Sequence, residues 1–368
     1  MNNTALWLAL SKVEGIGAIR IKNLLAHFNS IENIASADVK SLEEVEGISA
    51  GLAMSIVKVR NQIDIEAELK KNKEKQINII TIDNPDYPLM LKDIYDSPAI
   101  LYYKGNYSAS LFEKSLAIVG TRSATIYGRE IAKNLAGELV KQGITVVSGM
   151  AAGIDTAAHK GALTAGGKTV AVPGCGADII YPASNKELYW EIVKNGLVLS
   201  EYPPETMPEA GRFPARNRII SGLCRGVIII ETPEKSGALI TADFALEQGR
   251  EVFAVPGNIN NPKNKGCHNL IRQGAILITE TKDILDELGW SEQFIKSSPK
   301  DKSPINLTDK EQKIYSLLGD GPVHIDVILE KSGINSSEIM QILMMLELKG
   351  IIQQLPGKFF TVSANFSM

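Results

Sequence analysis

The sequence predicts an α/β protein built on a doubly wound, mostly parallel sheet, with a helical region before it and a winged helix after it. Three observations support this fold class. Residues 106–289 alternate short apolar runs with helical stretches, as parallel strands and their crossover helices do. Two similar Gly-containing phrases precede this region, and a helix-rich segment follows a polar linker.

The composition limits the class of protein and of site. The chain has 368 residues, 44% of them hydrophobic and 22% charged, which is typical of a soluble globular protein with two or three domains. Three widely spaced cysteines and four histidines without metal-ligand spacing predict a cytoplasmic protein with no disulfide framework, metal or cofactor. No apolar stretch is long enough for a membrane span. Because the net charge is −3, any anion site must be a local cluster.

Residues 1–75 are predicted to be a helical domain. The phrases VEGIGAIRIKNLL and VEGISAGLAMSIV each place a Gly-containing turn before an apolar-periodic helix, the pattern of a helix-hairpin-helix repeat. Backbone N–H groups at such a helix start can hold a phosphate. The alternative is a small packing domain, which the six basic and six acidic residues of 1–60 favour. A charged helix over 61–75 and a Pro-rich connector with short strands over 76–105 follow.

The sheet domain is predicted to span residues 76–290. Its expected strands are the apolar runs at 115–120, 144–149, 168–174, 196–201, 226–231, 251–257 and 275–280. In sheets of this kind ligands bind outside the carboxyl ends of the strands. Those ends read VGTR, VSGMAAG, PGCGAD, ETPEKSG and PGNINN, and they are rich in glycine.

The first strand end, AIVGTRSATIYGRE, lacks both the dinucleotide fingerprint and the P-loop Lys-Ser/Thr. Gly120 allows a close backbone approach, and the N–H groups after it, beginning at Thr121, can face an anion where the next helix starts. Arg122 would reach over the same edge, where it can bind phosphate or stack on a base. A surface ion pair is the alternative for Arg122.

The second strand end, VVSGMAAGIDTAAHKGAL, turns the chain at Ser148 and Gly149. Asp155 and His159 lie four residues apart on one helical face, which could indicate acid–base chemistry. We favour a structural interpretation, in which Asp155 satisfies the helix start and orients His159, because no nucleophile or second carboxylate joins them.

Two further loops add polar groups to this edge. In VPGCGADIIYPASNKEL, Lys186 offers a positive charge, whereas Cys175 has no basic neighbour and is not expected to be a nucleophile. In ETPEKSGALITADFALEQGR, Ser236 and Gly237 precede a helix, and their hydroxyl and N–H groups suit a phosphate.

The stretch GRFPARNRIISGLCRG holds four arginines and no acidic residue. Such arginines need distant carboxylates or a bound polyanion. Arg216 and Arg218 alternate across Asn217, so we expect them to point in opposite directions, one meeting phosphate and the other bracing the loop. Arg212 and Arg225 are expected to be surface charges.

Residues 291–304 are predicted to be a linker, and 305–368 a winged helix-turn-helix domain with PGK as its wing turn. Residues 305–362 carry five Lys and seven Asp or Glu, and the expected recognition helix has one Lys and two Glu. A groove-reading helix normally presents Arg, Lys, Asn or Gln, and here Gln341 stands nearly alone. We therefore expect this domain to contact protein or to act as a structural cap.

Taken together, these phrases are closely similar to the DNA-processing protein A family, DprA or Smf. The matching phrases are IVGTR…YG, SGMAAGID…H, GCGAD..YP..N, SEYPP, FPARNRIISGL, SGALIT and GREVFAVPG, in that order over roughly residues 76–280. The resemblance implies a SAM-like helical front, an extended Rossmann-like domain that binds single-stranded DNA and forms a homodimer, and a winged tail. It further implies a non-enzymatic protein that protects incoming DNA and loads a RecA-type recombinase during natural transformation and homologous recombination.

The resemblance also implies site residues, with Arg122 as the leading DNA contact and the stretch 213–218 lining the same pocket. The expected DNA-binding set is Gly120, Thr121, Arg122, Ser148, Gly149, Lys186, Arg216, Asn217, Arg218, Ser236 and Gly237. The family often has Lys where this chain has Ala183, and Lys186 could substitute for it. The implied dimer contacts are His268, Ile271 and Leu277.

The alternative function is enzymatic. Nucleotide phosphoribohydrolases of the LOG type look similar at the level of the fold, with a Gly-rich anion loop. Their PGGxGTxxE stretch, which supplies the catalytic Glu, has no counterpart here, and the nearest segment is EKSGALITADFA. Similarity of fold alone does not carry function, so we expect a binding protein rather than an enzyme.

Overall fold

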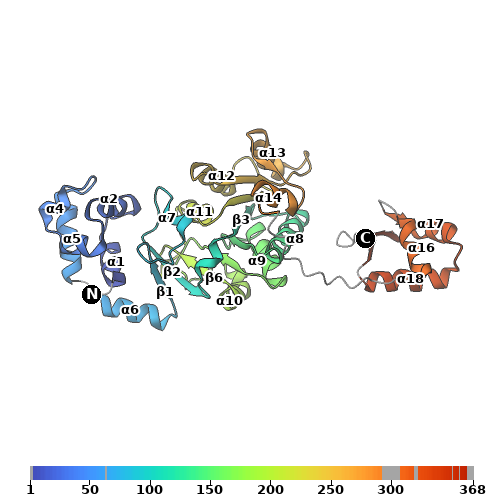
Figure 1. Cartoon of the computed structure of the whole chain (residues 1–368), viewed down its shortest axis with the longest axis horizontal. Coiled ribbons are helices and arrows are strands. Elements are labelled where there is room, and N and C mark those ends of the chain that lie inside the picture. Colours follow the sequence, from blue (N-terminus) through green and yellow to red (C-terminus); the bar gives the residue numbers. More distant parts are fainter. Residues whose placement is uncertain are drawn as a thin grey trace. The chain divides into compact units, whose positions relative to one another are not determined.

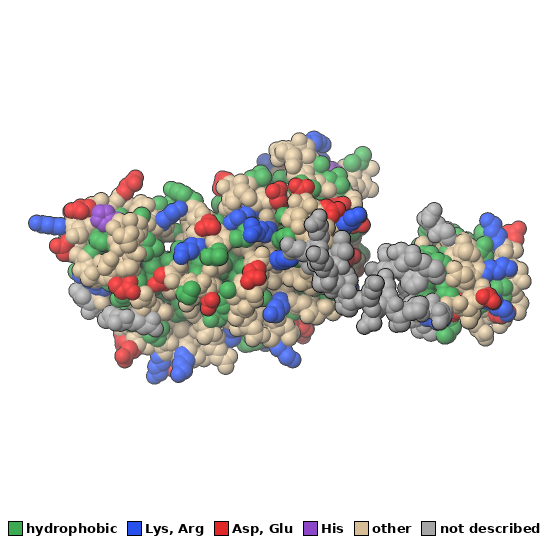
Figure 2. Space-filling view, viewed as in Figure 1, with side chains coloured by type: hydrophobic (Ala, Val, Ile, Leu, Met, Phe, Trp, Pro, Cys, Tyr) green, Lys and Arg blue, Asp and Glu red, His purple; other side chains and the backbone are tan. Residues whose placement is uncertain are grey.

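A computed structural model describes residues 3–62, 64–291, 307–318, 322–349, 351–355 and 357–362 (Figure 1). The chain divides into two compact units, Met1–Lys296 and Ser297–Met368. Most of the predicted linker, from residue 292 to 304, lies outside the described residues. Figure 2 shows basic and acidic side chains interspersed over one face of the first unit, in keeping with the small net charge.

A nine-stranded sheet forms the centre of the first unit, in the order β1-β2-β6-β5-β4-β3-β7-β8-β9. The strands from β6 to β9 in this order pair in parallel, and β1 and β2 are antiparallel additions at one edge. Their bounds are β1 Asn78–Thr81, β2 Ile100–Gly105, β3 Ser115–Gly120, β4 Thr145–Ser148, β5 Thr169–Ala171, β6 Leu197–Ser200, β7 Gly226–Ile230, β8 Glu251–Ala254 and β9 Ile276–Leu277. The predicted α/β class with a mostly parallel sheet is confirmed, and the connector strands prove to belong to the same sheet.

Helices cover both faces of this sheet because its central strands are apolar on both sides. The helices of the sheet region are α7 Leu89–Lys92, α8 Ile126–Lys141, α9 Ile154–Thr164, α10 Lys186–Asn195, α11 Arg212–Gly222, α12 Gly237–Glu247, α13 Lys265–Arg272 and α14 Thr281–Glu287, with 3-10 turns at Ala109–Phe112, Ala183–Asn185 and Pro262–Asn264. Helices α8, α9 and α14 share one core with Leu116 and Ile118, and α11, α12 and α13 share the other with Ala117 and Val119.

The neighbouring strands β3 and β7 therefore send their connections to opposite faces, α8 to one and α12 to the other. This is the topological switch point of the sheet, where such folds open a crevice at the carboxyl ends of the strands.

The front of the chain forms short helices, as predicted. They are α1 Asn3–Ser11, α2 Ala18–Phe28, α3 Ile31–Ser36, α4 Val39–Glu43, α5 Ala50–Gln62 and α6 Ile65–Glu74. The turns of the two similar phrases contain Gly15 and Gly47, both with φ near +85°, a conformation that glycine adopts without strain. Arg20 donates hydrogen bonds to the carbonyl oxygens of both glycines and so ties the two hairpins together. This helical core continues onto strand β2 through Ile100 and Tyr102.

The second unit is a winged helix. Its helices are α16 Asp309–Leu318, α17 Ile325–Ser332 and α18 Ser336–Leu348, and its strands are β10 Val323–His324, β11 Ile352–Leu355 and β12 Phe359–Val362. The three strands pair antiparallel in the order β10-β12-β11. Gly333 turns the chain between α17 and α18 with φ +64°, and Asn335 caps α18 by accepting the N–H of Glu338. Pro356 of the predicted wing turn lies outside the described residues.

The packing of α8 against α9 generates a stability prediction. A Cβ at Gly161 in α9 would lie 2.1 Å from the carbonyl oxygen of Lys133 in α8, so only glycine allows this approach. We expect Gly161→Ala to lower the free energy of unfolding by about 2 kcal/mol, because the two backbones must separate. Urea unfolding of the whole chain measures this change.

Gly137 in α8 supplies the matched control. A Cβ there would have its nearest neighbours at 3.6 Å, an ordinary contact. Gly137→Ala should leave stability unchanged or raise it by about 0.5–1 kcal/mol through helix propensity. Equal effects of the two substitutions would contradict the packing described.

Candidate nucleic-acid interface

A groove opens at the carboxyl ends of β3, β4, β5 and β7. A cavity of about 600 Å³ forms its larger part, between the loop after β3, the start of α11 and the start of α12. A smaller cavity of about 150 Å³ adjoins it over the ends of β4 and β5. The residues that line both are Arg122, Ala151, Tyr181, Phe213 and Arg216. The groove thus occupies the crevice that the sheet topology creates.

Glycine is required at two positions in this edge. A Cβ at Gly120 would lie 1.9 Å from the carbonyl oxygen of Ile230 on the neighbouring strand. A Cβ at Gly149 would lie 2.7 Å from a carboxylate oxygen of Asp155 and 2.8 Å from a guanidinium nitrogen of Arg216. Both predicted glycines therefore serve packing, and Gly149 lets two buried charged groups approach each other.

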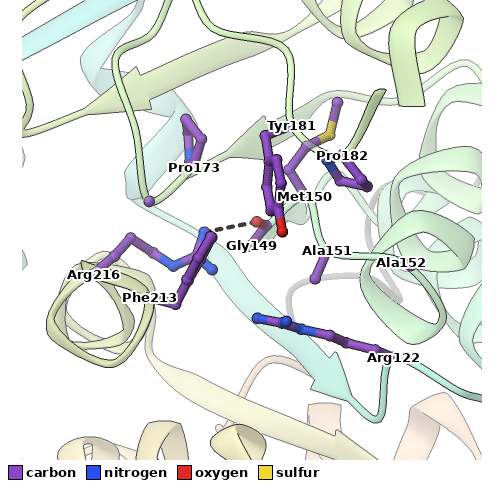
Figure 3. A pocket seen from close by; sticks show the side chains of 11 residues that line it. Arg122, Gly149, Met150, Ala151, Ala152, Pro173, Tyr181, Pro182, Phe213 and Arg216 are labelled. Atoms are coloured by element: carbon purple, nitrogen blue, oxygen red, sulfur yellow. Dashed lines mark hydrogen bonds between the residues drawn. The ribbon is translucent and has the colours of Figure 1, made fainter. Parts of the chain in front are cut away.

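Arg216 is a buried cation at the centre of the groove. Its guanidinium donates to the carbonyl oxygen of Gly149 at 2.6 Å (Figure 3). It also donates to the carbonyl oxygen of Val172, and its Nε donates to the side-chain oxygen of Asn217 at 3.2 Å. Burial lowers the pKa of Arg216 to about 10, which leaves it charged at neutral pH. No carboxylate of the described residues lies within ion-pair distance of it. Two carbonyl dipoles and the attraction of the nearby Asp155 carboxylate stabilise this charge inside the protein.

Asp155 lies beside Arg216, and backbone N–H groups engage its carboxylate. Its carboxylate accepts the N–H groups of Gly149 at 3.1 Å and Ala151 at 3.3 Å. Burial raises the pKa of Asp155 to about 6, against the opposing attraction of Arg216. Asp155 therefore satisfies the backbone around the start of α9, as the structural interpretation expected.

The expected contact between Asp155 and His159 was wrong. His159 instead donates from Nδ1 to the hydroxyl of Thr169 at 2.7 Å, because that hydroxyl uses its own proton on the carbonyl of Val146. Its Nε2 is buried without a partner among the described residues, and burial lowers the pKa of His159 to about 3. The helical spacing correctly placed the two side chains on one face of α9, but Asp155 binds backbone N–H groups and His159 binds Thr169.

The start of α8 is already occupied by an internal anion. Glu231, at the end of β7, accepts the backbone N–H of Thr125 at 2.7 Å and its hydroxyl at 2.5 Å. A Cβ at Gly128 would lie 2.3 Å from the same carboxylate. The anion predicted for the loop after Gly120 is therefore the protein's own Glu231, and sequence reasoning missed this pairing across 106 residues.

The start of α12, in contrast, remains open to the groove. Ser236 uses its hydroxyl to accept the N–H of Ala238 at 3.3 Å, while Gly237 is exposed with no atom within 4 Å of its Cβ position. Asn217 of α11 donates to the carbonyl oxygen of Gly237 at 3.1 Å and fixes this helix start in place. Lys235, which sequence reasoning missed, adds an exposed positive charge to the lining.

An aromatic and cationic wall faces this open helix start. The guanidinium of Arg122 lies 5.2 Å from the ring centroid of Phe213, and the rings of Phe213 and Tyr181 are 5.4 Å apart (Figure 3). Arg122 is exposed, and within the described part of the chain no carboxylate pairs with it. A planar cation stacked on a ring and open to solvent is suited to phosphate and to bases.

Arg218 points away from this wall, on the opposite side of α11 from Arg216. It forms ion pairs with Asp96 at 2.8 Å and with Glu201 at 2.7 Å. These distant carboxylates occupy its guanidinium, so Arg218 braces α11 against the connector and is not retained in the candidate site. Arg212 pairs with Glu209 at 3.1 Å.

The remaining predicted residues fall in different places. Thr121 lines the larger cavity, whereas Ser148 is buried and donates its hydroxyl proton to the carbonyl of Ile118. Lys186 is exposed at the start of α10 and lines neither cavity. The structure therefore does not bring Ser148 or Lys186 into the groove.

The three residues that the family resemblance implies as dimer contacts lie on α13 and on the last strand of the sheet, β9. His268 contacts the carbonyl oxygen of Gly257 at 3.1 Å, and Ile271 packs partly against the core. Leu277, on the edge strand β9, is 47% exposed.

Among the described residues, no group of three or more His, Cys, Asp and Glu side chains could hold a metal ion. Cys175 is buried, and burial raises the pKa of its thiol to about 11.

No helix in the described ranges is both long and apolar enough to cross a bilayer.

Comparison with known proteins identifies related sequences over most of the chain. The sequence model for DNA recombination-mediator protein A matches residues 78–289, that for the DprA winged helix domain matches 298–358, and that for the SAM-like helix-hairpin-helix tandem matches 8–59. The chain is 36% identical to protein Smf of Synechocystis over 386 residues, which covers 96% of this chain and 97% of that protein. It is 48% identical to DNA processing protein DprA of Streptococcus pneumoniae over 230 residues, 61% of this chain and 79% of that one.

Two solved structures show the same architecture. The X-ray structure of DprA from Streptococcus pneumoniae has a TM-score of 0.70 at 39% identity and covers 78% of this chain and 98% of its own. DNA processing protein A from Helicobacter pylori, solved for insight into its single-stranded DNA binding mode, has a TM-score of 0.53 at 33% identity and covers 59% of this chain and 97% of its own.

The burial of His159 predicts a pH dependence of stability. The pKa of His159 is about 3 in the folded state and 6.5 in the unfolded state, so as the pH falls the unfolded state takes up a proton first. The stability that neutral His159 contributes is therefore complete above pH 6.5 and is lost as the pH falls toward 3. Between pH 7.5 and 5 this loss should reach about 2 kcal/mol. Urea unfolding at both pH values measures it, with His159→Gln as the variant that lacks this contribution.

Asp155 is present in both proteins, and its raised pKa acts with the opposite sign, so the difference between the two isolates His159. An equal loss of stability in the wild type and in His159→Gln would show that the imidazole is not held neutral.

Proposed function

The chain belongs to the DNA recombination-mediator protein A family, and on that premise we propose that it binds single-stranded DNA in the groove at the carboxyl ends of β3, β4, β5 and β7. The observation that carries the proposal is the wall of Arg122, Phe213 and Tyr181, because it sets an exposed unpaired cation against two aromatic rings. Cations beside stacking platforms are the usual means of binding single strands without sequence preference.

In the proposed complex, different residues of the groove contact the phosphates and the bases. Arg122 and Lys235 contact phosphate directly, and Arg216, which also lines the cavity, adds a further positive charge. The open N–H groups at Gly237 receive a second phosphate. Phe213 and Tyr181 accept the faces of unpaired bases, which every base offers, so little sequence preference is expected.

The cellular role that we propose is that of the family. The protein protects incoming single strands and loads a RecA-type recombinase onto them, during natural transformation and homologous recombination in the cytoplasm. Family membership supports this part of the proposal, and the relatives carry the name DNA processing protein. The groove supplies the DNA-binding half of such a role.

We also propose a homodimer that pairs through the edge of the sheet at β9. His268 and Ile271 lie on α13, the helix that precedes β9, and Leu277 exposes an apolar side chain on β9 itself. An edge strand with an exposed leucine is suited to association with a second copy.

The enzymatic alternative is not favoured by the geometry. Asp155 and His159 have separate partners, and Glu231 is engaged at the start of α8. The groove thus lacks an assembled acid–base pair among the described residues, and the family match is to DNA-processing proteins rather than to phosphoribohydrolases.

Arg122→Ala tests the groove. We expect it to weaken binding of oligothymidylate about tenfold at 0.1 M salt, since a charge-assisted phosphate contact and a stacking surface are lost together. The slope of log affinity against log salt should become shallower by about 0.7 for each phosphate contact removed. Fluorescence anisotropy over a salt series measures both quantities.

Arg225→Ala is the matched control, because Arg225 is an exposed arginine just before β7, at the opposite end of the strand from the groove. It should leave affinity and slope unchanged. Binding by Arg122→Ala that equals the wild type in both quantities would rule out the groove as the DNA site.

Leu277→Glu tests the dimer edge. A carboxylate placed at this apolar edge should convert a dimer to a monomer, as measured by sedimentation equilibrium at micromolar concentration. Leu246→Glu, on the exposed side of α12, is the control and should not change the mass. If Leu277→Glu also leaves the mass unchanged, the proposed dimer edge is wrong.

A further inference from the structure

A second surface with the same chemistry adjoins the groove beyond Arg122. The first turn of α8 exposes Ile126 by 74% and Tyr127 by 54%, and the loop after β8 exposes Ile259 by 79%. Packing does not account for three large apolar side chains in solvent at one strand edge. We call the surface formed by Ile126, Tyr127, Ile259, Lys263 and Lys265 the shelf.

The two segments of the shelf are distant in the sequence and are joined by a hydrogen bond. Lys263, in the loop after β8, donates from Nζ to the backbone carbonyl of Ser123, the residue next to Arg122. This hydrogen bond places the loop after β8 next to Ser123, and so next to the residue that follows Arg122 of the wall.

The loop after β8 is held in one shape. Asn261 accepts the N–H of Lys263 at 3.0 Å, and Asn258 accepts that of Asn260 at 2.9 Å. Asn264 is buried and donates back to the carbonyl of Asn258 at 3.2 Å. A loop ordered in this way presents Ile259 and Lys265 as a preformed surface.

The charge of this surface is positive although that of the whole chain is not. Lys263 and Lys265 follow β8, Arg122 precedes α8 and Arg129 lies in its first turns, and Lys263 joins the two segments at Ser123. Glu231 is buried beneath the start of α8 and is engaged by Thr125, which leaves Glu130 as the exposed carboxylate of the first turns. Cations interleaved with an exposed aromatic ring match the backbone and the bases of a single strand.

We propose that a single strand leaving the groove at Arg122 continues across the shelf, with an unpaired base stacked on Tyr127 and a phosphate held by Lys265. This inference rests on the proposed function of the groove and extends it by a second subsite. Single-stranded DNA is the occupant because the shelf is continuous with the groove and repeats its pairing of cation and ring. A duplex does not offer the free base face that Tyr127 requires.

The test compares two lengths of oligothymidylate on the full chain. An oligonucleotide of about four nucleotides fills the groove alone, and one of about fifteen also reaches the shelf. Tyr127→Leu keeps apolar area but removes the ring, and Lys265→Gln removes the charge. We expect each to weaken binding of the long oligonucleotide about fivefold or more and to leave the short one within about twofold of the wild type.

Two controls separate the shelf from general effects. Tyr95→Leu removes another exposed tyrosine, in the connector away from the groove, and Lys282→Gln removes an exposed lysine of α14. Both should bind both lengths as the wild type does. Thermal unfolding checks that each variant is folded, which is expected because Tyr127 and Lys265 are exposed.

The outcomes distinguish this inference from the function on which it rests. Loss confined to the long oligonucleotide supports the shelf. Wild-type binding of both lengths by Tyr127→Leu and Lys265→Gln overturns the shelf while leaving the groove intact. If a variant weakens binding of the short and the long oligonucleotide equally, the shelf is not a separate subsite and the inference is overturned. If the wild type binds neither length, the proposed function fails and the shelf fails with it.

Discussion

The groove depends on one buried guanidinium. Arg216 lies at the junction of α11 with the carboxyl ends of β4 and β5, where it donates to two backbone carbonyls instead of to a carboxylate. Removing a cation from water is costly, and carbonyl dipoles offset that cost without cancelling the charge. The helix that carries Arg216 also carries Phe213, Asn217 and Arg218, so its placement sets the aromatic wall, the position of α12 and the brace to the connector.

A second constraint concerns the helix starts that meet at this edge. Each one concentrates free N–H groups, and an unsatisfied start would attract any anion. Glu231 occupies the start of α8, and Asp155 satisfies the loop that leads into α9. The start of α12 at Gly237 has no such internal carboxylate in the part of the chain that is described. Of these three helix starts, the start of α12 is therefore the one that internal carboxylates of the described residues leave open.

The sequence allowed the sheet, its order of strands and helices, and the glycine-rich edge to be predicted, because apolar runs and Gly-containing turns are local signals. The placement of the connector strands in the same sheet was not predictable in this way, since strand pairing depends on contacts distant in the chain. The partners of the charged side chains were not predictable for the same reason. The partners of Arg218 lie 17 and 122 residues away, and Glu231 lies 106 residues from the turn that it caps. Helical spacing placed Asp155 and His159 on one face, but it carried no information about Thr169, which binds His159.

The central claim is that single-stranded DNA follows the wall of Arg122 and Phe213 to the open start of α12. A crystal structure of the chain with an oligothymidylate tests this claim most directly. The account predicts a phosphate within hydrogen-bond distance of the Gly237 N–H, another on Arg122, and a base against Phe213, with Glu231 still bound to Thr125. A phosphate that displaces Glu231 from the start of α8, or DNA bound elsewhere on the chain with the groove empty, would contradict it.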